Sequence, residues 1–146
     1  MKKALAILAF AAFATAPLTA SADAIADRQA LMKDTGAAVK TIAPIAQGKA
    51  DFDAAVVLAA LTKINENAQK LDFATHYPAG SDKGDTEASP KIWEDPAGFE
   101  AALAKYKKDA AAAVAANPQD IDSFKAQFGV VAANCGACHE TFRIKK

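Results

Sequence analysis

The chain has 146 residues, which is enough for one domain and too few for two of ordinary size. Alanine, the best helix former, fills 39 positions, while residues that favour strands are scarce, so the composition excludes a β-sandwich or β-barrel as the expected fold. The formal net charge is +0 and no long basic run occurs, which argues against nucleic acid as a partner.

The first 22 residues have the pattern of a secretory signal peptide. Lys2 and Lys3 precede an uncharged apolar run over 4–16, and small residues at 20–22 form a cleavage site. A retained anchor is the alternative, but the apolar run is short of the ~20 residues that a membrane span needs. We therefore expect residues 1–22 to be cleaved and residues 23–146 to form the mature domain. That domain would have 15 basic and 17 acidic residues, would not insert into a membrane, and would be periplasmic.

The first helix of the mature chain is expected over residues 23–47. Ile25, Met32 and Val39 recur every seven residues on one stripe of this segment, which indicates an inward face. Pro44 threatens the last turn of the helix, because proline cannot donate a backbone hydrogen bond.

Three more helices follow. The second begins at Asp51 or Asp53 as its N-cap and ends near residue 71, and the others cover 95–116 and 120–144. The stretch 72–94 is polar and rich in turn residues, so we expect it to be irregular. Four amphipathic helices predict an all-α, antiparallel four-helix bundle, and such bundles place cofactors between facing helices.

The last predicted helix carries a C-x-x-C-H motif made of Cys135, Cys138 and His139. Two thiols on one helical turn suit thioether attachment of a haem through its two vinyl groups, and the adjacent histidine suits the iron. A redox dithiol or a structural disulfide is the alternative, but no βαβ pattern is present. A zinc site would need another ligand, and His76, the only other histidine, is distant. The motif therefore predicts one covalently attached haem c between the helices.

This placement of the motif, on the last helix of a bundle, resembles the class II cytochromes c, the cytochrome c′ family. The resemblance lies in the C-x-x-C-H-x-x-F-R ending over 135–143, the Pro-Lys-Ile-Trp run at 90–93 and the Arg-Gln pair at 28–29, and it extends over 23–146. It implies a four-helix bundle with haem bound through the two cysteines and ligated axially by His139. It also implies redox partner proteins and a homodimer formed through the first two helices.

The sixth iron position separates two functions in that family. Low-spin members place a first-helix methionine there, and Met32 lies four residues after Arg28, where the resemblance puts the distal residue. Ligation by Met32 opposite His139 would give a single-electron carrier. In the alternative, Met32 is a core methionine, Leu31 or the ring edge fills the distal space, and a five-coordinate iron binds nitric oxide or carbon monoxide.

Three further side chains are expected near the haem edge: Arg28, Gln29 and Arg143. Arg28 would offset a propionate charge, and Arg143 follows His139 by one helical turn. For each of them a solvent-exposed helix face is the alternative. The sequence contains no acid–base constellation, so we expect no enzymatic activity.

Overall fold

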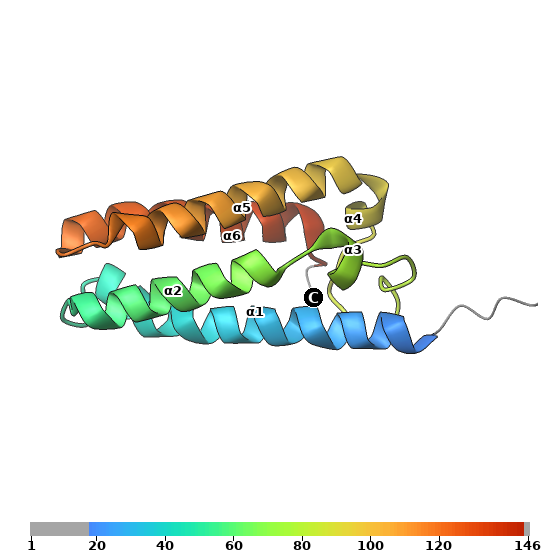
Figure 1. The fold of residues 1–146 in the computed structure, drawn as a ribbon, viewed down its shortest axis with the longest axis horizontal. Helices are drawn as coiled ribbons and strands as arrows, with labels where there is room; N and C mark the ends of the chain where they lie inside the picture. Colours follow the sequence, from blue (N-terminus) through green and yellow to red (C-terminus); the bar gives the residue numbers. More distant parts are fainter. Residues whose placement is uncertain (1–17, 145–146) are drawn as a thin grey trace, which may run out of the picture.

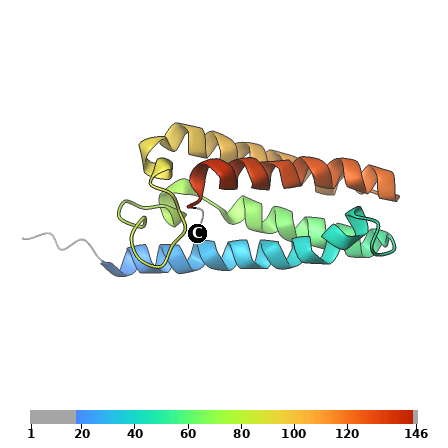
Figure 2. The same cartoon turned by 180° about the vertical axis from the view of Figure 1, so that it is seen from behind.

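The computed structural model describes residues 18–144, and its elements are helices (Figure 1). They are α1 (Leu18–Ala46), α2 (Ala54–Lys70), α3 (Phe73–His76), α4 (Lys91–Glu94), α5 (Pro96–Ala116) and α6 (Ile121–Phe142). The four long helices, α1, α2, α5 and α6, alternate in direction and lie side by side (Figures 1 and 2). The predicted all-α, antiparallel four-helix bundle is therefore confirmed.

Helix ends coincide with residues that satisfy free backbone groups. Asp53, rather than Asp51, is the N-cap of α2, and its carboxylate accepts from two backbone N–H groups at 2.8 and 3.1 Å. Asp95 caps α5 and Asp120 caps α6 in the same way. Asn117 ends α5 in the left-handed conformation with φ 42°, which asparagine tolerates better than most residues. These caps confirm three of the predicted boundaries.

Helix α1 differs from its expected range at both ends. It begins at Leu18 rather than at residue 23, because the intervening residues are mostly good helix formers. It also continues through Pro44 to Ala46. Pro44 lies so close to the end of the helix that the backbone hydrogen bond it cannot donate is lost only in the last turn. Gly48, with φ 69°, then turns the chain toward α2.

The stretch 72–94 was expected to be irregular, and that expectation was wrong at two places. Helices α3 and α4 lie within it, each of four residues, which is too short to produce a periodic sequence pattern. The stretch gathers at one end of the bundle, next to the end of α6 (Figure 1). There the Ser89 N–H donates to the Phe142 carbonyl at 3.0 Å, and the Ile144 N–H donates to the Glu87 carbonyl at 2.8 Å. We call this pairing of residues 87–89 with 142–144 the strap.

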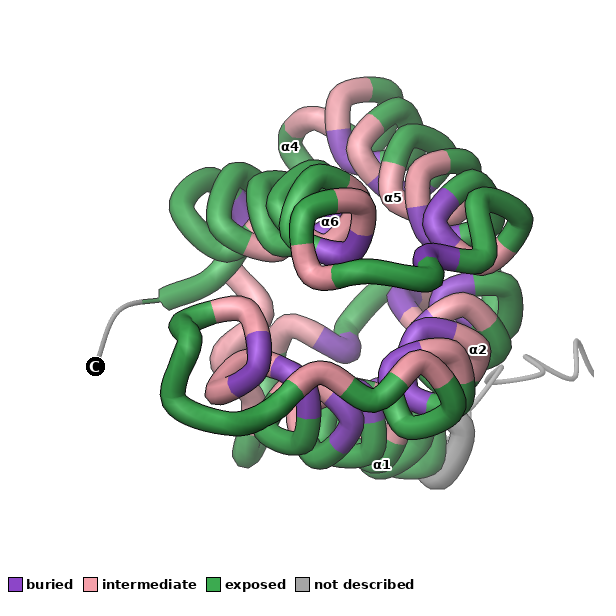
Figure 3. The backbone as a smooth tube through the Cα atoms, turned by 90° about the vertical axis from the view of Figure 1, so that its left-hand side faces the viewer, coloured by how far each residue is buried: buried purple, intermediate pink, exposed green. Residues whose placement is uncertain are grey.

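Seen from one end of the bundle, the buried positions of the long helices lie mainly toward the interior (Figure 3). The buried side chains form two clusters. One lies toward the end where α1 turns into α2, and its most buried members are Ile42, Val57, Leu61, Ile64 and Phe124. The other lies beside α3 and α4 and consists of Leu71, Tyr77, Ile92, Phe99, Leu103 and Phe142. Helix α1 packs on α2, α2 on α5 and α5 on α6, whereas α1 and α6 approach one another less closely.

Candidate functional site

A cavity of about 620 Å³ lies between α1, α5, α6 and the loop before α4. Its volume falls in the range of roughly 300–1,000 Å³ that is usual for cofactor sites. Both hydrophobic clusters contribute to its walls, with Val131 from the first and Leu71 and Phe99 from the second. The cavity brings together all seven side chains expected at the site: Arg28, Gln29, Met32, Cys135, Cys138, His139 and Arg143.

The two cysteines are half-buried on α6 and line the cavity as free thiols. The Cys135 Sγ lies 3.4 Å from the Val131 carbonyl one turn earlier, which helps to orient its side chain. Burial raises the pKa of both thiols, so they remain protonated at neutral pH and are poor metal thiolates or redox nucleophiles. This environment does not favour the alternative of a reactive dithiol.

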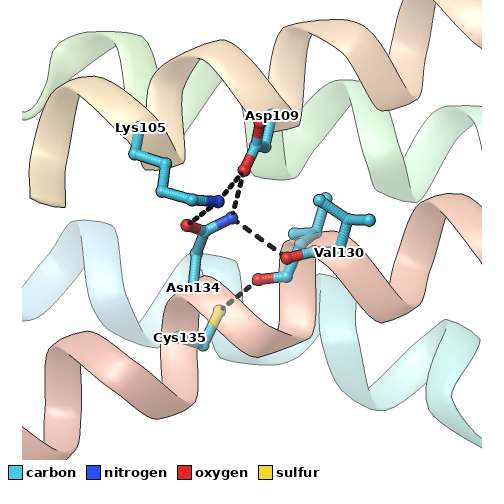
Figure 4. A network of polar contacts seen from close by, with 6 residues as sticks. Lys105, Asp109, Val130, Asn134 and Cys135 are labelled. Atoms are coloured by element: carbon cyan, nitrogen blue, oxygen red, sulfur yellow. Dashed lines mark hydrogen bonds and ion pairs between the residues drawn. The ribbon is translucent and has the colours of Figure 1, made fainter.

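The residue before the first cysteine is tied firmly to α5 (Figure 4). The Asn134 amide nitrogen donates to the Asp109 carboxylate at 2.8 Å and to the Val130 carbonyl at 3.0 Å. Its amide oxygen accepts from the Lys105 ammonium at 3.1 Å, and Lys105 also pairs with Asp109 at 2.5 Å. Because every polar atom of the buried Asn134 side chain has a partner, this network opposes rotation of α6 and keeps Cys135 toward the cavity.

His139 lies in the last turn of α6 and remains exposed at the cavity wall. Partial burial lowers the pKa of its imidazole, the Arg143 cation lowers it further, and the Glu87 carboxylate opposes both effects. The neutral imidazole, which is the form that binds metal ions, is therefore favoured.

Met32 lines the same cavity as His139 but from a different helix, α1. Its side chain is 37% exposed, more than a position on an inward stripe suggests. Its exposed neighbours Gln29, Lys33 and Asp85 also line the cavity, so this wall borders solvent. Leu31, the alternative distal residue, packs instead against the second hydrophobic cluster.

Arg28 is only 4% exposed, so the alternative of a solvated helix face is wrong for this residue. Its guanidinium donates to the His76 carbonyl at 2.8 Å, to the Ser81 hydroxyl and carbonyl at 2.9 and 2.5 Å, and to the Thr86 hydroxyl at 2.8 Å. It also lies 5.1 Å from the centre of the Tyr77 ring. Burial lowers the pKa of the guanidinium, and within residues 18–144 no carboxylate forms a salt bridge with it.

Gln29 and Arg143 line the cavity and are exposed, as the alternative of a solvent-exposed helix face predicted. The side chain of each nevertheless forms a hydrogen bond to the loop before α4. Gln29 donates to the Asp85 carbonyl at 2.7 Å. The Arg143 Nε donates to the Glu87 carboxylate at 2.6 Å, and its Nη2 also pairs with that carboxylate. Both side chains therefore attach the loop before α4 to a long helix.

A family model described as cytochrome c′ matches residues 23–143. The chain belongs to the cytochrome c′ family. The cytochrome c′ of Rhodopseudomonas palustris (strain ATCC BAA-98 / CGA009) is 46% identical over 130 residues, covering 87% of this chain and 86% of that protein. The cytochrome c-556 of Agrobacterium fabrum is 38% identical over 126 residues, covering 86% and 84%. A solved cytochrome c′ structure from Rhodopseudomonas palustris superimposes with a TM-score of 0.78 at 45% identity, covering 85% of this chain and 98% of that one.

Membership in the cytochrome c′ family makes haem c the cofactor of this chain and makes the protein a c-type cytochrome of electron transport. The cavity residues fit that group. The apolar walls suit a porphyrin. The buried Arg28 cation, which forms no salt bridge with a carboxylate of residues 18–144, suits an anionic edge. Within residues 18–144, no three His, Cys, Asp or Glu side chains converge to hold a bare metal ion.

Several residues at the cytochrome c′ site could not be predicted from sequence patterns, because their roles depend on long-range contacts. Ser81 and Thr86 hold Arg28, and Glu87 holds Arg143, each across more than fifty positions of the chain. They lie in the polar loop, where no local pattern distinguishes them from solvated residues.

Proposed function

We propose that this cytochrome carries single electrons, with haem attached through Cys135 and Cys138 and ligated by His139 and Met32. The observation that carries the proposal is the position of Met32, which lines the same cavity as His139 from a different helix. A thioether sulfur is an established axial partner of histidine at haem iron. The haem supplies the one-electron chemistry, and the protein supplies two fixed ligands that leave no position open for a substrate.

The attachment part of the proposal is supported by the environment of the thiols. Both are uncharged, half-buried and on one turn of α6, and the polar network at Asn134 keeps that turn oriented. The Cys135 thiol contacts the Val131 carbonyl, while the side chain of the adjacent Asn134 is bonded to Lys105, Asp109 and Val130. The proposal therefore assigns Cys135 and Cys138 to the haem and includes no enzymatic reaction.

The proposal also places the mature protein in the periplasm after removal of residues 1–22. The family match supports this division, because it begins at residue 23. Within residues 18–144, no helix combines the length and the apolar character needed to cross a membrane. Redox proteins are the proposed partners, and a homodimer through α1 and α2 is part of the proposal because Val56 exposes apolar surface on α2.

A second candidate function is a five-coordinate haem that binds nitric oxide or carbon monoxide. The comparisons by themselves favour it at least as well, because the matching family model and the relative with 46% identity both have the name cytochrome c′. The exposed fraction of Met32 also fits a side chain that does not ligate. The two candidate functions differ in whether Met32 occupies the sixth coordination position of the iron, and spectroscopy can distinguish them.

The deciding experiment compares the absorption spectra of the wild-type protein and of Met32→Leu. Ligation by Met32 should give a low-spin ferrous form with a sharp α band that does not bind carbon monoxide readily. Met32→Leu nearly conserves volume, so the bundle should stay folded while the iron becomes five-coordinate and binds carbon monoxide. Leu61→Met is a matched control, because Leu61 is buried in the first cluster and does not line the cavity. A wild-type protein that is already high-spin would refute Met32 ligation and support the gas-binding candidate.

A further inference from the structure

The strap ends directly beside the proposed proximal ligand. Its two backbone hydrogen bonds join residues 87–89 to the last residue of α6 and to the chain just after it, and His139 lies one helical turn before Arg143. Glu87, His139 and Arg143 all line the cavity. Main-chain hydrogen bonds therefore hold the loop before α4 against the end of α6 independently of the side chains.

The side chains add a charge pair to this arrangement. Two guanidinium nitrogens of Arg143 contact one carboxylate oxygen of Glu87. Both charged residues line the same cavity as His139, and Arg143 follows His139 by one helical turn. Within residues 18–144, the Arg143 cation at this end of the cavity is therefore paired with the Glu87 carboxylate.

We propose that Glu87 is a positioning residue that holds and neutralises Arg143 beside His139, and so keeps the reduction potential of the haem lower than Arg143 alone would set it. The inference rests on haem attachment with His139 as a ligand, as in the proposed function, but not on ligation by Met32. Reduction lowers the positive charge of the iron by one unit. An unbalanced cation nearby favours the reduced form, and an unbalanced carboxylate favours the oxidised form.

The size of the effect follows from the exposure of the pair. The side chains are 50% exposed for Arg143 and 36% for Glu87, so water and salt screen their charges. We expect each single neutralisation to change the equilibrium constant for reduction by about two- to fivefold, and the change should shrink as ionic strength rises. A fivefold change corresponds to about 40 mV, because a tenfold change is 59 mV for one electron.

The test is a redox titration of the holoprotein carrying Glu87→Gln, Arg143→Gln or both substitutions. Glu87→Gln should raise the midpoint potential, Arg143→Gln should lower it, and the double variant should return close to wild type because the charge is balanced again. Glu87→Asp keeps the charge and should also stay close to wild type. Lys63→Gln and Glu66→Gln form the matched control, because that exposed ion pair lies on α2 away from the cavity.

If the Glu87–Arg143 ion pair acted only by holding the loop in place, the variants would give a different result. Loss of the ion pair should then shift the potential in the same direction in both single variants, and the double variant should not recover. That outcome, or shifts no larger than those of the control pair, would overturn the inference. The absorption spectrum of each variant reports the iron ligands independently, so a failure of Met32 ligation can be distinguished from a failure of the charge balance.

Discussion

Replacing Arg28 with methionine should lower the free energy of unfolding, mainly by destabilising the loop at one end of the bundle. Methionine keeps much of the aliphatic stem of arginine and removes the guanidinium. Four hydrogen bonds to residues 76, 81 and 86 are then lost, together with the contact of the cation with the Tyr77 ring. Among residues 18–144, no other side chain connects α1 to all three of these positions.

The expected magnitude follows from the burial of the acceptors. Ser81 is 0% exposed, so its carbonyl and hydroxyl cannot regain water easily, and a stranded buried acceptor costs about 1–3 kcal/mol. The cation–π contact adds about 1 kcal/mol. Removing a buried charge relieves part of its desolvation penalty, which offsets some of this loss. We expect Arg28→Met to lower the free energy of unfolding by about 2–4 kcal/mol.

Urea unfolding of the holoprotein, followed by far-ultraviolet circular dichroism, measures this change. Arg28→Lys should be intermediate, since one ammonium cannot replace a planar fork of donors. Gln29→Met is the matched control, because Gln29 is an exposed neighbour with a single bond to the same loop, and it should cost about 0.5 kcal/mol or less. Hydrogen exchange should show the loss of protection concentrated in residues 76–86. An Arg28→Met midpoint equal to that of Gln29→Met would refute the reasoning.

Two further predictions concern haem attachment and alkaline stability. Mass spectrometry of the exported protein should show a chain that begins at Asp23 and still carries one haem after extraction with acid acetone. Replacing Cys135 and Cys138 with alanine should abolish the added mass of the haem. Extraction of the haem from the wild-type protein would contradict covalent attachment. Burial raises the pKa of Tyr77 to about 12, from about 10 in an unfolded chain. The unfolded state therefore loses this proton first, and the free energy of unfolding should fall between pH 10 and 12 by up to about 1.4 kcal/mol per pH unit for this group. Tyr77→Phe should reduce that slope in urea titrations, and an unchanged slope would exclude Tyr77 as its source.

The parts of the fold that sequence reasoning predicted are those with local causes. Asp53, Asp95 and Asp120 cap helices through hydrogen bonds to residues two or three positions later, and that geometry is contained in a short segment. Helices α3 and α4 could not be predicted, because four residues give no period. The strap could not be predicted either, since its backbone hydrogen bonds join segments more than fifty positions apart.

The same distinction applies to the site. The C-x-x-C-H motif is local, so its two thiols and His139 could be predicted to share one turn of α6 and to line one cavity. Met32 could be placed at the cavity by its spacing from Arg28. The partners of Arg28 are set by how the loop folds back on α1, and nothing in the sequence near position 28 specifies them.

Arg28 and Arg143 show why residue type and position are not enough to define a role. Both were expected at the haem edge as cations, and both line the cavity. Arg28 is buried and donates to uncharged acceptors, and no carboxylate in the described part of the chain forms a salt bridge with it. Its removal should therefore act on stability first. Arg143 is half-exposed and paired with Glu87, so its removal should cost little stability. Because its charge lies beside His139, its effect should be seen instead in the equilibrium between the two oxidation states of the iron.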